Sequence, residues 1–444
     1  MPNPKNDIVY AAFDRFPSPK GAATHIDAFV SGLGSRFGNV HLITIQSEDA
    51  ELNHVDVPQV LRHFSNAEKK RVDWTPTPDW KAPGVCHHPL PAPGENLFER
   101  TLSFRREMQN WWRREIGDRP VSVFHCRSIF EGYWIAQDKK RYCRNLVFEV
   151  NGLPSIELKY RYPGAADDHE LLRKLRHQEQ VCLDAADRIV TVSWVNAEHL
   201  VSRGVDAKKI CVIRNGVDLE LFRSESTPPD PNLGSVNRPV RMLYSGTMSA
   251  WQGVPHAIEA VALLRRDFEA MLTLVGPARP RQIREMEEQI WKLGLSDSVS
   301  ILSPVSKREL VALHHEADVI LAPMTRNDRN LVQGCCPLKV LEAMASGTPL
   351  IASDLPVVRE LVTDGVEALL VRPGSAKAIK DGMLKLMSEQ RLAERLSSAA
   401  RCRVEQHFSW KRAQAELLAV YESLLEDSNS RCSSGASLAA SVSS

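Results

Sequence analysis

Short runs of apolar, often β-branched residues alternate along this chain with segments of helical periodicity. Ile26, Phe29, Val30 and Leu33 repeat at the i, i+3, i+4, i+7 spacing of an amphipathic helix. The apolar runs show little polar alternation, which is typical of parallel strands covered by helices on both faces. The pattern predicts an α/β fold with parallel sheets and crossover helices.

The predicted strands fall into two groups. Those in the first half of the chain span residues 8–12, 40–45, 121–125, 146–150, 188–192 and 210–213. Those in the second half span residues 240–245, 271–275, 299–302, 319–322, 350–352 and 368–371. A polar, Pro- and Ser-rich stretch at 224–239 separates the groups and predicts an interdomain linker. We therefore expect two doubly wound domains, 1–223 and 240–407.

Three further stretches depart from this alternation. Residues 57–95 contain many prolines and little periodicity, which predicts a long irregular excursion from the first domain. A last amphipathic helix is expected at 408–426. The Ser- and Ala-rich tail at 427–444 is expected to be disordered.

Composition narrows the possible functions. A chain of 444 residues, 43% hydrophobic and 25% charged, is typical of a soluble globular protein with more than one domain. Its net charge of +1 gives no reason to expect nucleic acid as a partner. Neither a membrane span of ~20 apolar residues nor a signal peptide is evident in the sequence. The cysteines lack zinc-binding spacing, so we expect reduced thiols and a cytoplasmic protein.

The most informative segment is QGCCPLKVLEAMASGTPLIA, residues 333–352. Pro337 and Gly347 punctuate a short helix that carries Lys339 and Glu342. Amides at a helix N-terminus suit a diphosphate, and a carboxylate one turn later suits ribose hydroxyls. The alternative is an ordinary surface helix of an α/β domain.

With its neighbours, this segment resembles the family-4 retaining glycosyltransferases, or glycosyl transferases group 1, of the GT-B fold. The resemblance covers roughly residues 7–425 and rests on the order of FPSPKGAATHI at 16–26, IVTVSWVNAEHL at 189–200, ICVIRNGVDLELF at 210–222, YSGTMSAWQGV at 244–254 and CCPLKVLEAMASGTPLIAS at 335–353. It implies two facing Rossmann-like domains with a cleft between them. The acceptor would bind mainly to the first domain and the nucleotide sugar to the second. The last helix would cross back to the first domain.

The resemblance also implies a donor site formed by the glycine loop, the opening loop of the second domain and the carboxylate helix. Its residues would be Gly21, Ala22, Gly246, Thr247, Gln252, Gly276, Gln333, Gly334, Cys335, Cys336 and Leu338. Glu342 matches the second carboxylate of the family's Glu-x7-Glu motif and would hold the ribose. The first carboxylate is replaced by Gly334. Gln333, Asn330 or a backbone amide near Cys335 are its possible substitutes.

Other family positions differ in charge. Thr247 and Gln252 stand where many members place an arginine and a lysine that neutralise the diphosphate. Lys339 is the preferred compensating cation, with Arg326 and Arg329 as alternatives.

The first domain supplies the remaining candidates. His125 and Arg127 match the two positions of the family's His-x-His, so we assign His125, Arg127, Lys339 and Glu342 to the catalytic group. A core histidine or a structural ion pair is the alternative at the first two. Asn151, just after the next strand, is expected on the acceptor side.

The sequence lacks an Asp-x-Asp motif, so we expect a metal-independent enzyme without a cofactor. The resemblance implies transfer from a nucleotide sugar to a carbohydrate or lipid-linked hydroxyl acceptor, with retention, in polysaccharide or glycoconjugate biosynthesis. The basic aromatic segment 98–116 suggests peripheral contact with the inner face of a membrane, or alternatively a packed helix. Two other functions stay open: a non-catalytic GT-B relative that binds nucleotide sugars or assembly partners, and a GT-B phosphorylase or epimerase.

Overall fold

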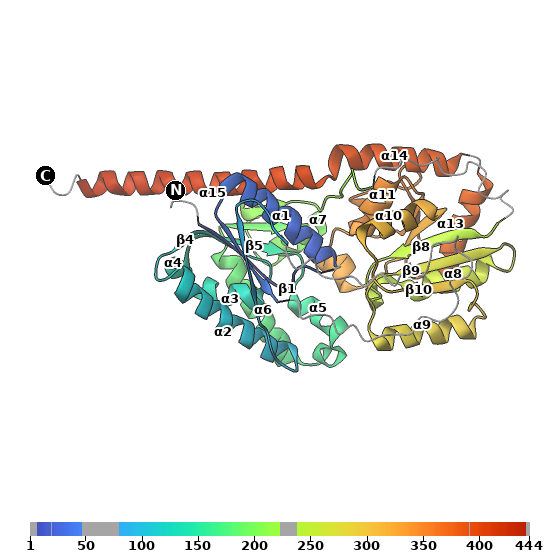
Figure 1. Cartoon of the computed structure of the whole chain (residues 1–444), viewed down its shortest axis with the longest axis horizontal. Coiled ribbons are helices and arrows are strands. Elements are labelled where there is room, and N and C mark those ends of the chain that lie inside the picture. The colour runs from blue at the N-terminus through green and yellow to red at the C-terminus, as the bar shows by residue number, and fades with distance from the viewer. Residues whose placement is uncertain (1–6, 19, 47–79, 223–237, 390, 441–444) are drawn as a thin grey trace. The chain divides into compact units, whose positions relative to one another are not determined.

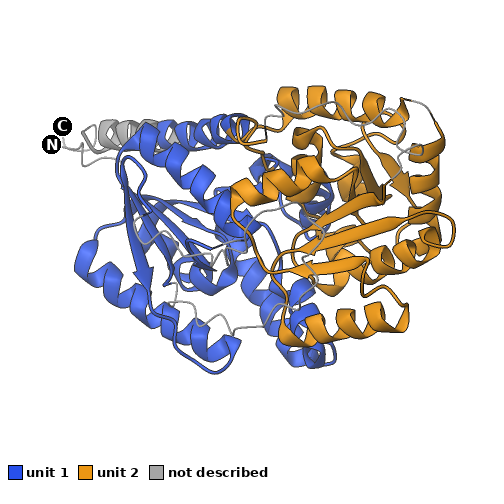
Figure 2. Cartoon of the chain, turned by 45° about the vertical axis from the view of Figure 1, so that its right-hand side comes forward, with its two compact units in different colours: residues 1–49, 76–214, 411–444 blue, residues 50–75, 215–410 orange. Residues whose placement is uncertain are grey.

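Near-continuous apolar runs form the strands of two parallel sheets, and helices cover both faces of each sheet (Figure 1). The computed structural model describes residues 7–18, 20–46, 80–222, 238–389 and 391–440. The chain divides into two compact units, one of residues 1–49, 76–214 and 411–444 and the other of residues 50–75 and 215–410 (Figure 2). Each unit has its own sheet and its own buried core.

The first unit is built on a seven-stranded sheet with the order β3-β2-β1-β4-β5-β6-β7. Its strands are β1 (Ile8–Arg15), β2 (Val40–Ile45), β3 (Val85–Leu90), β4 (Val121–Cys126), β5 (Cys143–Val150), β6 (Arg188–Thr191) and β7 (Ile210–Val212), all paired in parallel. The chain winds outward in opposite directions from β1 and β4. The carboxyl ends of these two strands therefore form a topological switch point, where ligands of open α/β sheets bind.

The helices of the first unit connect these strands and include most of the C-terminal helix. They are α1 (Gly21–Phe37), α2 (Leu97–Glu115), α3 (Ile129–Gln137), α4 (Lys139–Tyr142), α5 (Pro154–Arg161), α6 (His169–Ala185), α7 (Trp194–Ser202) and α15 (Trp410–Ala440), with short turns η2 (Pro163–Ala166) and η3 (Ala207–Lys209). Nε2 of Gln414 donates to the carbonyl of Ala28 over 2.6 Å, which ties α15 to α1. Tyr421, fully buried, packs on Phe37 from the same helix pair.

The second unit repeats the doubly wound plan with six strands in the order β10-β9-β8-β11-β12-β13. Its strands are β8 (Val240–Ser245), β9 (Ala270–Val275), β10 (Val299–Leu302), β11 (Val319–Ala322), β12 (Leu350–Ser353) and β13 (Leu369–Val371). Its helices are α8 (Val254–Leu264), α9 (Pro280–Lys292), α10 (Lys307–Glu316), α11 (Leu338–Ser346), α12 (Pro356–Arg359), α13 (Ala376–Ser388) and α14 (Leu392–His407), with turns η5 (Ala250–Gln252) and η6 (Arg329–Gln333). Here the switch point lies between β8 and β11.

One part of the expected irregular excursion at 57–95 is a strand instead. Residues 85–90 form β3, which pairs with β2 from Val40↔Val85 to Ile45↔Leu90. Its sequence, VCHHPL, lacks a continuous apolar run because β3 lies at the sheet edge, where polar residues and proline are tolerated. Residues 57–79 of the excursion and 224–237 of the expected linker lie outside the described residues.

The C-terminal helix also differs from the expected disordered tail at 427–444. It continues through Ala440 instead of ending near residue 426. Extending an established helix costs little, since each further residue adds a hydrogen bond, and residues 427–440 include alanines and no proline.

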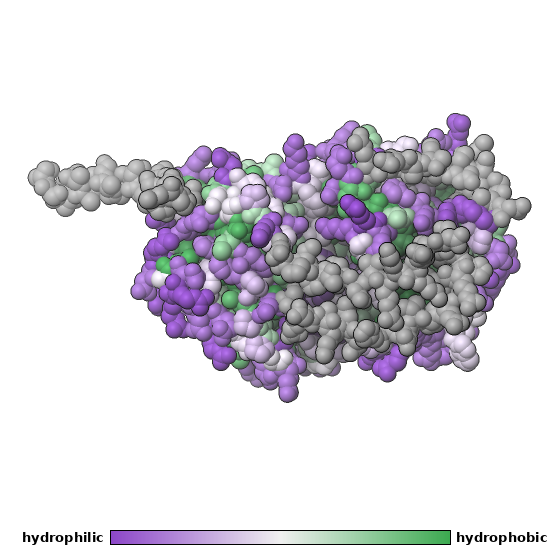
Figure 3. All heavy atoms as spheres, viewed as in Figure 1, coloured by the Kyte–Doolittle hydropathy of each residue, from purple (hydrophilic) through white to green (hydrophobic). Residues whose placement is uncertain are grey.

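Three aromatic residues of α2 belong to the core of the first unit, whereas Phe98 near the start of the helix is 45% exposed. Phe104, Trp111 and Trp112 are at most 2% exposed. Arg106 and Arg113 lie on the exposed side of the helix, and hydrophilic residues predominate on the face seen in Figure 3. The segment 98–116 therefore offers a basic surface without an exposed tryptophan, and membrane contact through it stays a prediction. In the described parts of the chain, no helix is both long and apolar enough to span a bilayer.

Phe104→Ala is expected to destabilise the first unit by about 3–5 kcal/mol, because the side chain is fully buried and packs edge-on against Phe13 at 5.3 Å. Urea denaturation followed by tryptophan fluorescence measures the effect. Leu102→Ala on the same helix is the matched control. Leu102 is 64% exposed, so its loss should change stability by less than about 0.5 kcal/mol. Equal midpoints for the two variants would contradict the described packing of α2.

Candidate active site

Polar residues gather at the carboxyl ends of the central strands of the first unit. Asp14 lies near the end of β1, His125 lies in β4 and Arg127 follows it. Glu149 lies in β5, and Asn151 follows that strand. Because the strands are parallel and adjacent, these residues share one edge of the sheet.

Glu149 is fully buried and holds most of this group together. Its Oε2 accepts a 2.7 Å hydrogen bond from the hydroxyl of Tyr10 and lies 3.0 Å from Nε2 of His125. Its Oε1 accepts from Nε of Arg127 over 2.9 Å and lies 3.0 Å from Nε2 of His25. Burial alone would raise the pKa of Glu149, but His25 and Arg127 hold it well below its usual range. The carboxylate is a fixed negative charge that orients the donors around it.

Both ring nitrogens of His125 are occupied. Burial lowers the pKa of His125, so the ring is neutral at pH 7. Its Nε2 faces the Glu149 carboxylate and therefore carries the proton, and its Nδ1 accepts from the hydroxyl of Tyr421 over 2.7 Å. The structure thus places His125 inside the first unit, where it supports Glu149 without reaching the surface.

Arg127 and Asn151 are oriented by the same carboxylate. Nη1 of Arg127 donates to Asp14 over 3.0 Å, and Nδ2 of Asn151 donates to Glu149. Burial lowers the pKa of Arg127, but Glu149 outweighs that effect and raises it, so the guanidinium stays charged. Asn151 is partly exposed, which leaves it nearer to solvent than His125.

The glycine loop leads directly into α1. This helix begins at Gly21 and Ala22, and the side chain of its N-cap residue, Lys20, makes no capping hydrogen bond. A helix start of this kind suits an anionic group, because its amides and its dipole both face the ligand.

In the second unit, Lys339 occupies the first turn of α11. This helix is bounded by Pro337 and Gly347, as the sequence predicts. Only 7% of Lys339 is exposed. Its ammonium donates to Oε1 of Gln252 and, over 3.3 Å, to the hydroxyl of Tyr244, and it lies 4.8 Å from the centre of that ring. Gln252 thus stands as a hydrogen-bond acceptor for the lysine at a position where the family often has a cation.

Lys339 and Glu342 titrate near neutrality. Burial lowers the pKa of Lys339 to about 7, although Cys335 and Glu342 oppose the shift. Burial raises the pKa of Glu342 to about 7, although Lys339 opposes it. The two residues are three apart on one helix face, as their spacing predicts. An anion bound beside Lys339 would stabilise its charged form and offset its burial.

Two glycines lie at neighbouring strand ends, and one of them leaves space for the lysine. Gly246 has φ +140, and a Cβ there would lie 3.0 Å from Nζ of Lys339. Gly276 has φ +138, and a Cβ there would lie 2.2 Å from the carbonyl oxygen of Gly246. Both follow neighbouring strands, β8 and β9, so this edge of the sheet presents backbone in place of side chains.

The turn before α11 is largely buried. Gln333 is fully buried, and Cys335 and Cys336 are at most 7% exposed. Gly334 has φ +78, a conformation in which the glutamate that the family places there would be strained. Asn330 is fully buried and donates to the carbonyls of Trp251 and Thr325, so its side chain holds the loop.

The remaining donor candidates line the same part of the second unit. The carbonyl of Thr247 accepts from Tyr244 over 2.6 Å. Arg329 lies 5.1 Å from the ring centre of Trp251 and lowers the pKa of Lys339, so it is close enough to add positive potential. Arg326 is exposed, and Leu338 at the start of α11 is partly buried.

The sequence analysis missed five residues of these clusters: Tyr10, Asp14, His25, Tyr244 and Tyr421. A signal existed for Tyr10 and for the role of Glu149, because each interrupts an otherwise apolar strand. A charged side chain in a strand covered on both faces needs partners, and a phenol in another strand of the same sheet is a natural one.

Both units match known protein families. The family profile described as Glycosyltransferase Family 4 matches residues 19–221, and the profile described as Glycosyl transferases group 1 matches residues 230–403. A D-inositol 3-phosphate glycosyltransferase of Xylanimonas cellulosilytica is 28% identical over 300 residues, 65% of this chain and 68% of that one. An MMP alpha-(1->4)-mannosyltransferase of Mycolicibacterium hassiacum is 33% identical over 236 residues, 53% of each chain.

Solved structures share the fold. Sucrose-phosphate synthase from Thermosynechococcus elongatus matches with a TM-score of 0.70 and 19% identity over 95% of this chain and all of that one. Anabaena Alr3699/HepE, solved with UDP and glucose, matches with a TM-score of 0.67 and 16% identity over 94% of this chain and all of that one. The architecture is thus the GT-B fold, with Rossmann-like units.

Proposed function

The chain belongs to glycosyltransferase family 4, and on that premise we propose that it moves a sugar from a nucleotide-sugar donor to a hydroxyl acceptor with retention of anomeric configuration. The observation that carries this proposal is the pair formed by Lys339 and Glu342 at the switch point of the second unit. Burial brings the pKa of both side chains to about 7, and strongly shifted pKa values of this kind are characteristic of functional sites.

On the donor side, Glu342 would accept hydrogen bonds from the ribose. Lys339, the backbone beside Gly246 and the start of α11 would meet the diphosphate. Structures of the same fold solved with UDP or UDP-glucose support a nucleotide-sugar donor. With Lys339 and backbone dipoles as the counter-charges, the transfer would proceed without a metal ion or cofactor.

The chemistry would need no protein nucleophile. The bond between the anomeric carbon and the β-phosphate oxygen breaks while the acceptor oxygen bonds to the same face of that carbon. The acceptor proton passes to the departing phosphate oxygen. Lys339 would stabilise the charge that develops on this phosphate, which is the interaction that speeds transfer.

The acceptor would bind to the first unit. Asn151 and Arg127 are oriented by Glu149 and present amide and guanidinium donors at the sheet edge. Such donors suit the hydroxyls of a carbohydrate or lipid-linked sugar in polysaccharide or glycoconjugate biosynthesis.

The nucleotide site can be tested by thermal shift against UDP, GDP, ADP and their sugar conjugates, without added metal. A nucleotide present at about 100 times its Kd should stabilise the protein by roughly 2.7 kcal/mol. Glu342→Ala should abolish most of this shift, and Glu287→Ala on the exposed face of α9 should keep it. A nucleotide-dependent shift that is equal in all three proteins would place the donor site elsewhere.

A non-catalytic GT-B protein that binds nucleotide sugars is the second candidate. Gly334 stands in place of a carboxylate, and Gln252 hydrogen-bonds Lys339 in place of a cation. Release of free nucleotide together with a glycosylated acceptor would show that the protein is a glycosyltransferase. Binding of the nucleotide sugar without release of nucleotide and without a glycosylated acceptor would favour the non-catalytic protein.

A further inference from the structure

Three side chains that can bind a metal ion meet on the edge strand of the first unit and on its neighbour. His41 is the second residue of β2, and Cys86 and His88 lie in β3, the end strand of the sheet. His41 pairs in register with Cys86, and His88 stands two residues further along β3. Because paired residues and alternate residues of a strand face the same side of a sheet, all three side chains share one face. We call them the His–Cys–His cluster.

The atoms of this cluster have a spacing close to that of metal ligands. Nδ1 of His41 and Nε2 of His88 are 3.1 Å apart. One ring nitrogen of each histidine and Sγ of Cys86 all lie within 4.8 Å of one another. In a tetrahedral zinc site, with Zn–N bonds of about 2.0–2.1 Å, two nitrogens are about 3.3 Å apart. One ion can therefore bind both rings with little movement, and the exposed Cys86 side chain can adjust more freely than the half-buried rings.

Trp111 of α2 packs against both histidines. It is 1% exposed, and its ring centre lies 5.5 Å from that of His41 and 4.9 Å from that of His88. The two imidazole rings are 5.3 Å apart, with an angle of 27° between their planes. Ligands that neighbouring side chains already hold together lose little freedom when an ion binds.

The ligand types favour zinc over magnesium or calcium. Imidazole nitrogen and thiolate sulfur suit Zn²⁺, whereas Mg²⁺ and Ca²⁺ prefer oxygen ligands. Three protein ligands leave a fourth tetrahedral position for water. Glu115, at the end of α2, is near enough to interact electrostatically with both rings. Its carboxylate pairs with Arg114 over 2.9 Å, so we do not include it among the ligands.

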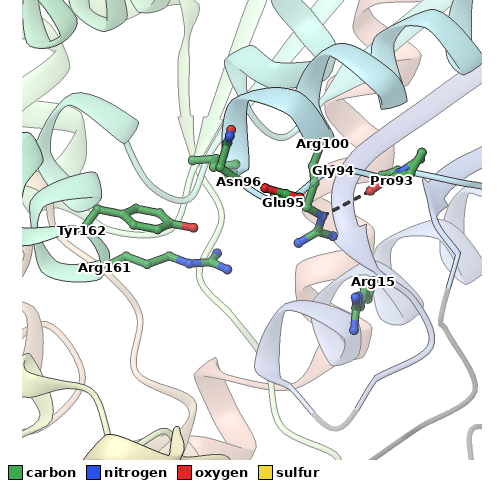
Figure 4. A pocket seen from close by; sticks show the side chains of 10 residues that line it. Arg15, Pro93, Gly94, Glu95, Asn96, Arg100, Arg161 and Tyr162 are labelled. Atoms are coloured by element: carbon green, nitrogen blue, oxygen red, sulfur yellow. Dashed lines mark hydrogen bonds between the residues drawn. The ribbon is translucent and has the colours of Figure 1, made fainter.

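The His–Cys–His cluster lies away from the sheet edge that carries the candidate active site. His41 and Cys86 are each one residue from the amino end of their strand. At the carboxyl edge of the same sheet opens a pocket of about 300 Å³, which Arg15, Asn96 and Arg161 help to line (Figure 4). A metal ion in the cluster would therefore have a structural role and would take no part in sugar transfer.

We propose that the His–Cys–His cluster binds one Zn²⁺ ion, which fastens the edge strand β3 to β2. Binding would release the thiol proton of Cys86 to solvent, and the proton between the two rings would move to the other nitrogen of its imidazole. His41 and His88 are 47 residues apart in sequence, so an ion that joins them closes a long stretch of chain and restricts the unfolded state. The ligands come from two strands, which is why cysteine spacing alone did not reveal them.

The first experiment is a titration of Co²⁺ into the full-length protein, after treatment with EDTA, removal of the chelator and addition of a phosphine reductant. We expect one equivalent of Co²⁺ to produce the ultraviolet absorption of a thiolate–Co²⁺ bond and the visible bands of a four-coordinate ion. One equivalent of Zn²⁺ should displace the Co²⁺, and an excess of Mg²⁺ should not. Absence of a saturable one-to-one spectrum would overturn the proposal.

Variants connect the spectrum to the cluster. Cys86→Ser should remove the thiolate absorption, and Cys86→Ser and His88→Gln should each weaken Zn²⁺ binding by at least about tenfold. Cys402→Ser is the matched control for the thiol, because Cys402 is also exposed but lies on α14 of the second unit. His169→Gln, at the exposed start of α6, is the control for the imidazole. Binding that is equal in the wild type and both cluster variants would be adventitious and would refute the site.

Stability provides a second readout, which tests the structural role. Zn²⁺ should raise the Tm of the wild type and of Cys402→Ser but not that of Cys86→Ser, because an ion that binds only the folded state stabilises it. Circular dichroism of the metal-free variants verifies that each is folded. A Tm of the wild type that does not respond to Zn²⁺ would contradict the fastening of β3. The nucleotide-dependent thermal shift should be the same in metal-free wild type and Cys86→Ser, so this inference stands apart from the proposed function.

Discussion

Glu149→Ala is expected to destabilise the first unit by about 3–5 kcal/mol at pH 7, because removing one member of a buried ion pair leaves the other without compensation. Glu149 is fully buried, and Nε of Arg127 lies 2.9 Å from it. The substitution also removes the acceptor of the buried Tyr10 hydroxyl. Urea denaturation monitored by circular dichroism and tryptophan fluorescence should show an earlier transition for the first unit.

The destabilisation caused by Glu149→Ala should become smaller at low pH. The folded-state pKa of Glu149 lies well below the ordinary value of 4.5. The stabilisation is therefore fully present above the unfolded pKa and is lost as pH falls through the folded pKa. The difference between wild type and Glu149→Ala should stay constant from about pH 7 to 5 and narrow at lower pH.

Glu115→Ala is the matched control in the same unit. Glu115 forms an exposed ion pair with Arg114, so its loss should leave the urea midpoint almost unchanged. If Glu149→Ala and Glu115→Ala unfold at the same urea concentration, the buried cluster does not stabilise the first unit as inferred.

The sequence predicted the strands that consist almost entirely of apolar residues, as burial on both faces requires. The apolar runs at 40–45 and 240–245 form β2 and β8 with the expected bounds, because strands covered on both faces need apolar side chains throughout. β3 was not predicted, because it lacks a continuous apolar run. It forms because its backbone completes the ladder of β2, an interaction that depends on a tertiary neighbour and leaves little trace in side-chain hydrophobicity.

The candidate site was predictable where it depends on local spacing. Lys339 and Glu342 share a face of α11 because they are three residues apart in a helix bounded by Pro337 and Gly347. Contacts between distant segments were not predictable. The partners of Lys339, Tyr244 and Gln252, are 95 and 87 residues away in sequence, and only the fold brings them together.

Lys339→Met is expected to lower the rate of sugar transfer by about 100- to 1000-fold, the loss typical of removing one donor that stabilises developing charge. The methionine keeps the volume of the side chain beside Gly246 but cannot interact with a phosphate. Product formation measured with saturating donor separates this loss from weaker binding. Lys385→Met on α13, where the lysine is 51% exposed, is the control and should retain wild-type activity. Comparable activity in the two variants would remove Lys339 from the catalytic group.

The pH dependence of kcat/KM provides a second, independent test of the roles of Lys339 and Glu342. Lys339 and Glu342 both have pKa values of about 7 in the free protein, so kcat/KM should follow a narrow bell near neutrality. Its alkaline limb reflects loss of the Lys339 proton, which removes the charge that meets the diphosphate. Its acid limb reflects protonation of Glu342, which removes an acceptor for ribose. Lys339→Met should flatten the alkaline limb and Glu342→Gln the acid limb, each with a shift of the other, since the two groups titrate as a coupled pair. A bell that is unchanged in both variants would assign these limbs to other groups.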